Sequence, residues 1–126
     1  MNWTEEEYRA YLARQTPHRS HTDDPSVSMA ERDLQATIRQ VALASGWLYY
    51  HTYDSRRSDL GFPDTVLAKP GRLLFAELKS TTGKPTQEQL VWLDVLSKSV
   101  PGVETYLWRP GDKGAALGCL QRKEPL

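Results

Sequence analysis

The stretch Gly61-Phe-Pro-Asp-Thr-Val-Leu-Ala-Lys-Pro-Gly-Arg-Leu-Leu-Phe-Ala-Glu-Leu-Lys79 decides the fold. Two runs rich in apolar residues, 65–69 and 73–79, flank the dipeptide Pro70-Gly71. Proline and glycine together are typical of a turn, and apolar runs of this length are typical of strands. The sequence therefore predicts a β-hairpin closed at Pro70-Gly71.

Three charged side chains meet at the open end of this predicted hairpin. Symmetric pairing about the turn puts Asp64 opposite Glu77, with Cβ atoms about 4.5–5.5 Å apart. Lys79 lies two residues beyond Glu77 and shares its face of the strand. Two carboxylates this close do not both stay ionised without a positive partner, and Mg²⁺ prefers such hard oxygen ligands. The cluster is typical of a phosphodiesterase site, in which a metal polarises the phosphate and Lys79 orients water or stabilises the transition state.

Two competing interpretations of these residues stay open at this level. Carboxylates and lysines on strands are commonly solvated or salt-bridged, and a Pro-Asp followed by Glu-x-Lys is a short pattern that also occurs by chance. A bulge at the turn would shift the pairing by one residue and separate Asp64 from Glu77.

Capping signals place the remaining elements. Ser28-Met-Ala-Glu31 matches a capping box that opens a helix, and an aromatic-rich run predicts a strand over 47–53. A second capping box, Thr86-Gln-Glu-Gln89, opens another helix, and a strand follows over 103–108. The helix stops are Gly46 and Pro101-Gly102, and the apolar residues at helical spacing are Leu34, Ile38, Val41 and Ala42 in the first helix and Leu90, Leu93 and Leu96 in the second. This order predicts a single-domain α/β fold with a mixed β-sheet flanked by helices.

Composition excludes several classes of protein. The chain has 126 residues, 16 basic and 16 acidic side chains and 39% apolar residues, which is typical of one globular domain. Its zero formal charge excludes a protein that holds nucleic acid by bulk cationic charge. Cys119 is the only cysteine, which excludes an intramolecular disulfide and a cysteine-rich zinc site. Without an apolar run of about 20 residues, a signal-peptide core or a phosphate-loop motif, we expect a cytoplasmic protein with no membrane span and no nucleotide cofactor.

The chain divides into three parts by pattern. Residues 1–27 are expected to form an arm, with a short helix over 4–15 followed by a polar linker that contains two prolines. The core is expected over 28–112. Residues 113–126 form a weakly patterned C-terminal tail.

Beyond the short motif, the sequence resembles the VRR-NUC domain, the virus-type replication–repair nuclease branch of the PD-(D/E)xK superfamily. The segments that carry the resemblance lie in order within 28–112 and are His51-Thr-Tyr-Asp-Ser-Arg-Arg-Ser58, Gly61-Phe-Pro-Asp64, Gly71-Arg-Leu-Leu-Phe-Ala-Glu-Leu-Lys79, Thr86-Gln-Glu-Gln89, Trp92-Leu93 and Tyr106-Leu-Trp-Arg-Pro110. The resemblance implies a restriction-endonuclease-like core that uses Mg²⁺ or Mn²⁺ to cut branched or otherwise structured DNA. Stand-alone phage and bacterial members resemble Holliday-junction resolvases of DNA repair and recombination and act as homodimers.

The resemblance also implies roles for individual residues. Asp64 and Glu77 match the metal-binding carboxylates, Lys79 matches the catalytic lysine, and the backbone carbonyl of Leu78 matches a further metal ligand. Glu31 matches an acidic residue of the first helix that completes the metal site. The third helical position is also where a capping box places a Glu, so both roles of Glu31 stay open.

A second set of polar residues is a candidate for contacting the DNA, because Arg and Lys donate to phosphate oxygens. These residues are His51, Arg56, Arg57, Ser58, Lys84 and Gln89. The competing interpretation is a solvated loop, a core histidine and, for Gln89, a helix-capping side chain. Aromatic residues of the 47–53 strand are expected in the core for the most part.

The expected function is therefore a divalent-metal-dependent endodeoxyribonuclease that resolves branched DNA as a homodimer. One alternative is a monomeric nickase or flap endonuclease. The other is a catalytically silent DNA-binding module that keeps the nuclease fold.

Overall fold

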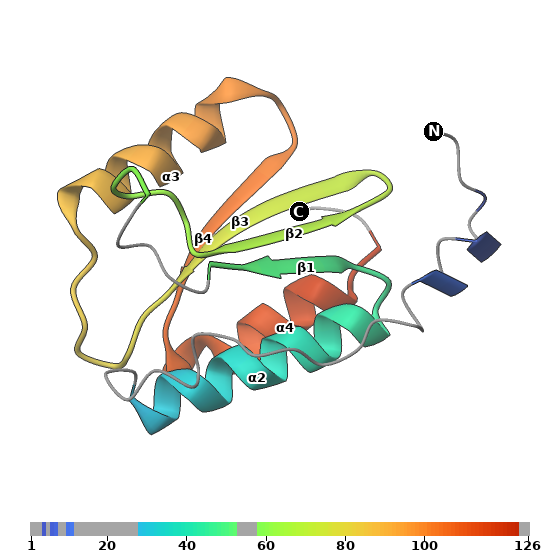
Figure 1. Ribbon diagram of the computed structural model, residues 1–126, viewed down its shortest axis with the longest axis horizontal. Coiled ribbons are helices and arrows are strands. Elements are labelled where there is room, and N and C mark those ends of the chain that lie inside the picture. Colours follow the sequence, from blue (N-terminus) through green and yellow to red (C-terminus); the bar gives the residue numbers. More distant parts are fainter. Residues whose placement is uncertain (1–3, 5, 8–9, 12–27, 53–57, 124–126) are drawn as a thin grey trace.

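The computed structural model describes residues 4, 6–7, 10–11, 28–52 and 58–123. Its elements are, in chain order, helix α2 (Met29–Ala44), strands β1 (Leu48–His51), β2 (Thr65–Lys69) and β3 (Arg72–Leu78), helix α3 (Gln87–Ser99), strand β4 (Val103–Trp108), the 3-10 helix η2 (Pro110–Asp112) and helix α4 (Lys113–Gln121). Figure 1 shows these elements as one mixed sheet with helices packed against it. The predicted α/β fold class is confirmed.

The register of the sheet confirms the predicted hairpin. The strand order is β1-β2-β3-β4, with β1–β2 and β2–β3 antiparallel and β3–β4 parallel. Lys69 pairs with Arg72 and Thr65 pairs with Ala76, so no bulge interrupts the ladder. Gly71 in the connecting turn has a φ of 85°, a conformation that glycine adopts without a steric penalty.

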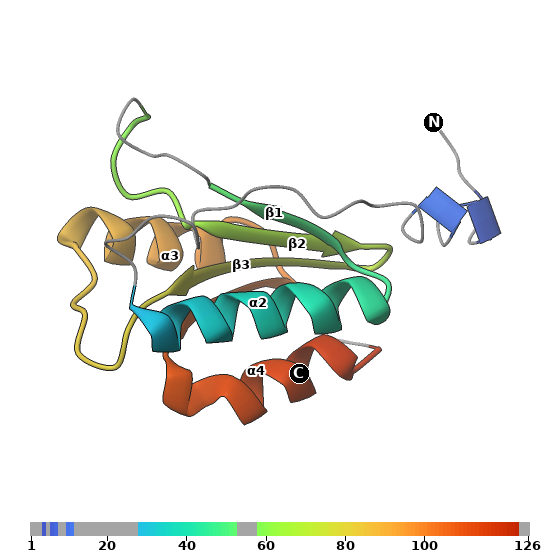
Figure 2. The ribbon, with the colours of Figure 1, turned by 60° about the horizontal axis from the view of Figure 1, so that its bottom comes forward.

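The helices cover both faces of the sheet. Figure 2 shows α2 and α4 side by side below it. Because side chains alternate along a strand, Leu74 and Leu78 of β3 face these two helices, whereas Phe75 faces the opposite way. Phe75 packs edge-on against Phe62, which packs in turn against Trp92 of α3. Helix α3 therefore lies on the other face, beside β3 and β4.

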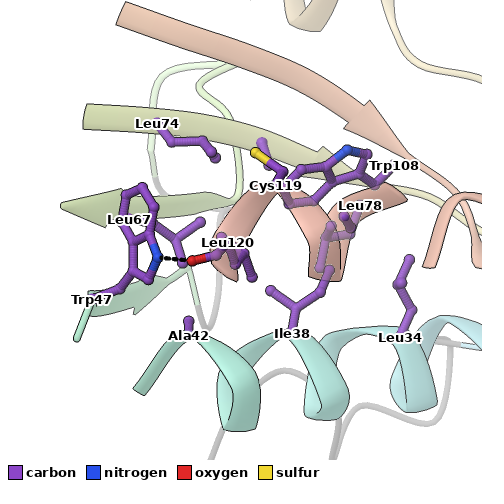
Figure 3. Close-up of a cluster of buried hydrophobic side chains, with 12 residues drawn as sticks. Leu34, Ile38, Ala42, Trp47, Leu67, Leu74, Leu78, Trp108, Cys119 and Leu120 are labelled. Carbon is purple, nitrogen blue, oxygen red and sulfur yellow. Dashed lines mark hydrogen bonds between the residues drawn. The ribbon is translucent and has the colours of Figure 1, made fainter. Parts of the chain in front are cut away.

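The main core lies between the sheet and the pair of helices α2 and α4, and Figure 3 shows its side chains. Helix α2 contributes the apolar stripe expected from the sequence. A hydrogen bond crosses this core, from the indole Nε1 of Trp47 to the carbonyl of Leu120 at 2.8 Å (Figure 3). The core side chains are Leu34, Ile38, Ala42, Trp47, Leu67, Leu74, Ala76, Leu78, Trp108, Ala116, Cys119 and Leu120.

Helix α4 lies within residues 113–126, the C-terminal tail whose sequence pattern is weak. It buries Ala116, Cys119 and Leu120, and its C-terminal end is held by Arg72. One guanidinium nitrogen of Arg72 donates to the carbonyls of Cys119 and Arg122, both at 2.9 Å. These bonds satisfy carbonyls that a helix end leaves without partners. Residues 113–121 are thus packed into the same core as the sheet.

Helix α3 buries less of its predicted stripe than the spacing indicates. Leu93 is buried and Leu96 is partly buried, but Leu90 is 49% exposed. Val91 and Val95 are exposed as well. The helix therefore packs on the sheet through a narrow stripe and leaves apolar side chains on its outer surface.

Little of the predicted N-terminal arm falls within the described residues. Thr4 and Glu7 form a reciprocal cap: the Thr4 hydroxyl accepts from the Glu7 N–H at 3.1 Å, and the Glu7 carboxylate accepts from the Thr4 N–H at 2.9 Å. This is a helix-start pattern at the position expected from the sequence. The predicted linker over 16–26 lies outside the described residues. Among those described, no helix is long and apolar enough to cross a membrane.

Candidate active site

Asp64 and Glu77 are held side by side at the end of the β2–β3 hairpin. The pairing of Thr65 with Ala76 makes them the next pair of the ladder. The backbone N–H of Asp64 donates to Glu77 Oε2 at 3.1 Å, and the backbone N–H of Leu78 donates to Asp64 Oδ1 at 3.2 Å. Each carboxylate is therefore fixed by the backbone of the opposite strand, as the symmetric hairpin predicted.

Glu77 is nearly enclosed and has two side-chain partners. Only 3% of the residue is exposed. Lys79 Nζ lies 3.5 Å from Glu77 Oε1, and the Gln89 amide donates to the same oxygen at 2.8 Å. Gln89 also accepts from the Thr86 N–H at 2.8 Å, so it caps α3 and contacts the acidic pair at once. The two interpretations of Gln89 that the sequence leaves open are thus compatible.

Asp64 has further side-chain contacts besides its pairing with Glu77. The Thr65 hydroxyl donates to Asp64 Oδ1 at 2.9 Å. His51 Nε2 lies 3.9 Å from Asp64 Oδ2, and His51 Nδ1 lies 2.9 Å from the Thr52 carbonyl. Because a carbonyl only accepts, Nδ1 carries a proton. His51 is therefore part of the site and not an isolated core histidine.

The electrostatics of the pair reflect burial and mutual repulsion. Burial raises the pKa of Asp64 well above its ordinary value, and the Glu77 carboxylate raises it further, whereas bonds from Thr65 and Leu78 lower it. Burial also raises the pKa of Glu77, although the Lys79 ammonium opposes that shift. One ammonium group does not compensate two enclosed carboxylates, so the site has a deficit of positive charge.

Gly61 fixes the loop that carries Asp64 against the start of α3. Its φ is 96°, and a Cβ at this position would lie 2.6 Å from the backbone carbonyl carbon of Glu88. Phe62, next in the chain, packs edge-on against Trp92 with ring centroids 5.1 Å apart. Only glycine permits this approach, which holds the Gly-Phe-Pro-Asp loop and α3 together around the acidic pair.

The structure brings together some of the predicted site residues and not others. Asp64, Glu77, Lys79, Gln89 and His51 form one cluster. Glu31 is partly buried on α2, and its charge contributes to the raised pKa of Asp64. Within the described residues, however, no three His, Cys, Asp or Glu side chains gather as a metal-binding group. Glu31 therefore lies near the pair without joining it in such a cluster.

The remaining predicted DNA contacts are less defined. Ser58 and Lys84 are exposed. Arg56 and Arg57 lie outside the described residues. The loop that carries Lys84 is organised by Arg109, whose guanidinium donates to the carbonyls of Ser80 at 2.8 Å and Gly83 at 2.6 Å. This loop follows Lys79 directly and thus lies next to the acidic pair.

Sequence reasoning missed two neighbouring polar groups, of which the Tyr49 hydroxyl interacts electrostatically with Asp64. Gln35 is only 1% exposed on α2, and the hydroxyl of Tyr49 on β1 is buried. Tyr49 was expected in the core, and its ring does pack against the core cluster. The one signal for Gln35 is its spacing, since it follows Glu31 by four residues and therefore shares a side of the helix.

The donor set suits a hard divalent cation. It consists of two adjacent carboxylates whose pKa values are raised although the Lys79 ammonium lies beside Glu77. Carboxylate oxygens are the ligands that Mg²⁺ and Mn²⁺ prefer, and Mg²⁺ in particular binds through one or two carboxylates while keeping several waters. Asp64 and Glu77 therefore fit a site of this kind.

Comparison with known proteins agrees with this arrangement at the level of the fold. A solved structure described as a VRR_NUC domain matches with a TM-score of 0.57 and 22% sequence identity, covering 72% of this chain and 97% of that one. No family model and no curated protein matches the sequence. The chain has the fold of the VRR_NUC domain.

Proposed function

We propose that this protein is a Mg²⁺- or Mn²⁺-dependent endodeoxyribonuclease that hydrolyses phosphodiester bonds in branched DNA. The observation that carries the proposal is the acidic pair at the end of β2 and β3, with Lys79 3.5 Å from Glu77, on a VRR_NUC fold. Two adjacent carboxylates can hold a metal that polarises a phosphate, and a lysine beside them can stabilise the charge that develops there.

Asp64 and Glu77 would hold the cation, together with the backbone carbonyl of Leu78. A bound divalent cation supplies Lewis-acid polarisation of the phosphate and makes a nearby water a better nucleophile. Lys79 keeps its ammonium beside Glu77 Oε1, where it orients a water or offsets the charge that develops on the phosphate oxygens. Gln89 holds Glu77 in place through the same oxygen.

DNA would approach from the side of the loops that frame the pair. Lys84 and Ser58 are exposed on these loops, and Arg56 and Arg57 precede Ser58 in the sequence. Arg and Lys at such positions contact phosphates and fix the register of the DNA without reading bases. We propose that the protein acts in the cytoplasm of a bacterial or phage-infected cell.

Homodimerisation would allow two strands of a junction to be cut together, because a two-fold protein presents two sites to a two-fold junction. The exposed apolar side chains Leu90, Val91 and Val95 on α3 are the surface we assign to the partner subunit. That surface borders the candidate site through Gln89 and Trp92 of the same helix.

The test uses four-way, flap and linear DNA with each strand labelled in turn, with and without Mg²⁺. Junction resolution predicts metal-dependent, symmetric incision of two opposed strands of the four-way substrate. A single nick in every substrate would instead support a monomeric nickase or flap endonuclease. DNA binding with no metal-dependent cleavage would support the silent binding module and would refute the proposed activity.

A further inference from the structure

Gln35 is a buried polar side chain whose amide is not satisfied by well-formed hydrogen bonds within the described part of the chain. The residue is 1% exposed, and neither its amide nitrogen nor its amide oxygen makes a hydrogen bond within the described part of the chain. Buried amides are nearly always hydrogen-bonded, because an unpaired group loses its contacts with water and gains nothing in return. An apolar side chain of the same size would be better for stability alone.

Gln35 is linked to the acidic pair through Tyr49. The Gln35 amide interacts weakly with the buried Tyr49 hydroxyl and lowers the pKa of the phenol, but neither group has good hydrogen-bond geometry with any other described residue. Tyr49 is close enough to Asp64 for the carboxylate to help raise the pKa of the phenol, although burial is the main cause. The charge of Glu31, which lies one turn earlier on the same side of α2, also raises the pKa of Asp64. Gln35 thus lies one helical turn from Glu31 and interacts with Tyr49, and both of these residues interact electrostatically with Asp64.

The chemistry of the unpaired groups restricts what they can bind. The Gln35 amide offers two N–H donors and one oxygen acceptor, and the protonated Tyr49 hydroxyl offers one donor. A dry apolar ligand would leave these groups unpaired. Water, which donates and accepts, satisfies them, and a divalent cation that keeps part of its hydration shell brings such waters to the Asp64 side of the site.

We propose that Gln35, with the Tyr49 hydroxyl, is a positioning residue that holds the hydration water of a divalent cation bound at Asp64 and Glu77. This inference rests on the proposed metal site and extends it to the α2 side of the sheet. Gln35 acts through water and does not itself coordinate the cation. Outer-shell groups of this kind align the coordinated waters, and losing one lowers metal affinity by about 10- to 100-fold.

The test compares wild type with Gln35→Met, which keeps the length of the side chain and removes its polar atoms. Mn²⁺ affinity is measured on the full chain by calorimetry, and the melting temperature of the metal-free protein is measured by circular dichroism. We expect Gln35→Met to bind Mn²⁺ about tenfold more weakly while its metal-free melting temperature rises. A merely structural glutamine would give the opposite sign in stability and an unchanged affinity.

Two further variants complete the experiment. Gln40→Met makes the same replacement on the exposed side of α2 and is expected to change neither quantity. Tyr49→Phe removes only the hydroxyl, so it tests the same water if Gln35→Met does not fold, and we expect weaker Mn²⁺ binding from it.

The possible failures are distinguishable. If wild type binds Mn²⁺ no better than Asp64→Asn does, the metal site itself is wrong. If wild type binds Mn²⁺ at that site and both Gln35→Met and Tyr49→Phe bind it equally well, the metal site stands and the role of Gln35 is refuted.

Discussion

At the residue scale, the acidic pair is held in a charge state that opposes folding. Asp64 and Glu77 are fixed by reciprocal backbone hydrogen bonds, so they cannot move apart to relieve their repulsion. Burial removes the water that would screen them. The fixed pair therefore costs stability when no further positive charge is present, and the same repulsion favours the binding of positive charge.

The raised pKa of Asp64 gives the metal-free protein a defined pH dependence. Between the ordinary pKa of an aspartate and the raised value, the folded state binds a proton that the unfolded chain has released. The free energy of unfolding therefore falls as the pH rises through this window and stays low above it. Asp64→Asn removes that contribution, because its amide oxygen still accepts from Leu78 and Thr65 without carrying charge.

We expect metal-free Asp64→Asn to melt several degrees higher than wild type at neutral pH and to show a flatter dependence of melting temperature on pH. Thermal melts from acidic to neutral pH measure both. Asp94→Asn, which changes an exposed carboxylate on α3, is the matched control and is expected to change little. A wild-type melting temperature that rises steadily with pH across the window would contradict the assignment.

At the element scale, the approach of the Gly61 loop to α3 joins the two halves of the site. Asp64 lies at the end of this loop, whereas Gln89 lies in the first turn of α3. Trp92, Phe62 and Phe75 pack edge-on behind them and fill the space between the helix and the sheet. The contact between Asp64 and Glu77 thus depends on the hairpin register, and the contact between Glu77 and Gln89 depends on where α3 begins.

Comparing Gly61→Ala with Gly71→Ala distinguishes the effect of the close approach to α3 from the effect of the positive φ alone. Both glycines have positive φ, but a Cβ at Gly71 meets nothing within 4 Å, whereas one at Gly61 meets the Glu88 backbone at 2.6 Å. We expect Gly71→Ala to cost about 1–2 kcal/mol from the left-handed conformation alone.

Gly61→Ala is expected to cost more than Gly71→Ala and also to lower nuclease activity, because the loop must move away from α3. Urea unfolding and cleavage assays on the two variants measure the difference. Equal destabilisation, with activity kept in both, would show that the loop does not position Asp64.

At the scale of the whole molecule, α4 completes the core through a buried ionic network. Arg72 donates to Glu104 at 2.8 Å and to the C-terminal carbonyls of α4, and its guanidinium lies over the Trp47 ring at 4.8 Å. Burial alone would raise the pKa of Glu104, but hydrogen bonds from Arg72 and Tyr106 outweigh burial and lower it. The network ties β3, β4 and α4 together at a distance from the acidic pair.

Removing one member of this ion pair leaves the other charge buried. We expect Glu104→Leu to destabilise the protein by about 3–5 kcal/mol, because Arg72 is then uncompensated. The double variant Arg72→Met with Glu104→Leu is expected to recover a large part of that loss. Denaturant unfolding of Arg72→Met, Glu104→Leu and the double variant gives a double-mutant cycle for the pair. Additive losses would show that the pair is not coupled.

Much of this architecture follows from local sequence signals. The turn at Pro70-Gly71 fixes the hairpin register, and that register alone brings Asp64 opposite Glu77. The capping residues Ser28 and Thr86 mark where α2 and α3 begin. These features are predictable because each depends on residues close together in the chain.

The features that the sequence did not predict depend on tertiary contacts. Helix α4 contains Gly114 and Gly118, which weaken its helical pattern, and it is stabilised by packing on α2 and by Arg72 from 47 residues earlier. Gln35 occupies a position in the apolar stripe of α2, where the sequence does not distinguish it from a core residue and only the burial of its poorly satisfied amide singles it out. The exposure of Leu90 depends on how α3 packs on the sheet, which helical spacing does not specify.

The most direct test of the account is the single-turnover cleavage rate of Lys79→Ala on branched DNA with Mg²⁺. Lys98→Ala, which removes an exposed ammonium paired with Asp94, is the matched control. If Lys79 stabilises the transition state, its loss lowers the cleavage rate by about 10²–10³-fold while the fold and DNA binding are retained, and Lys98→Ala cleaves as wild type does. Equal cleavage rates for wild type and Lys79→Ala would contradict the assignment of the active site.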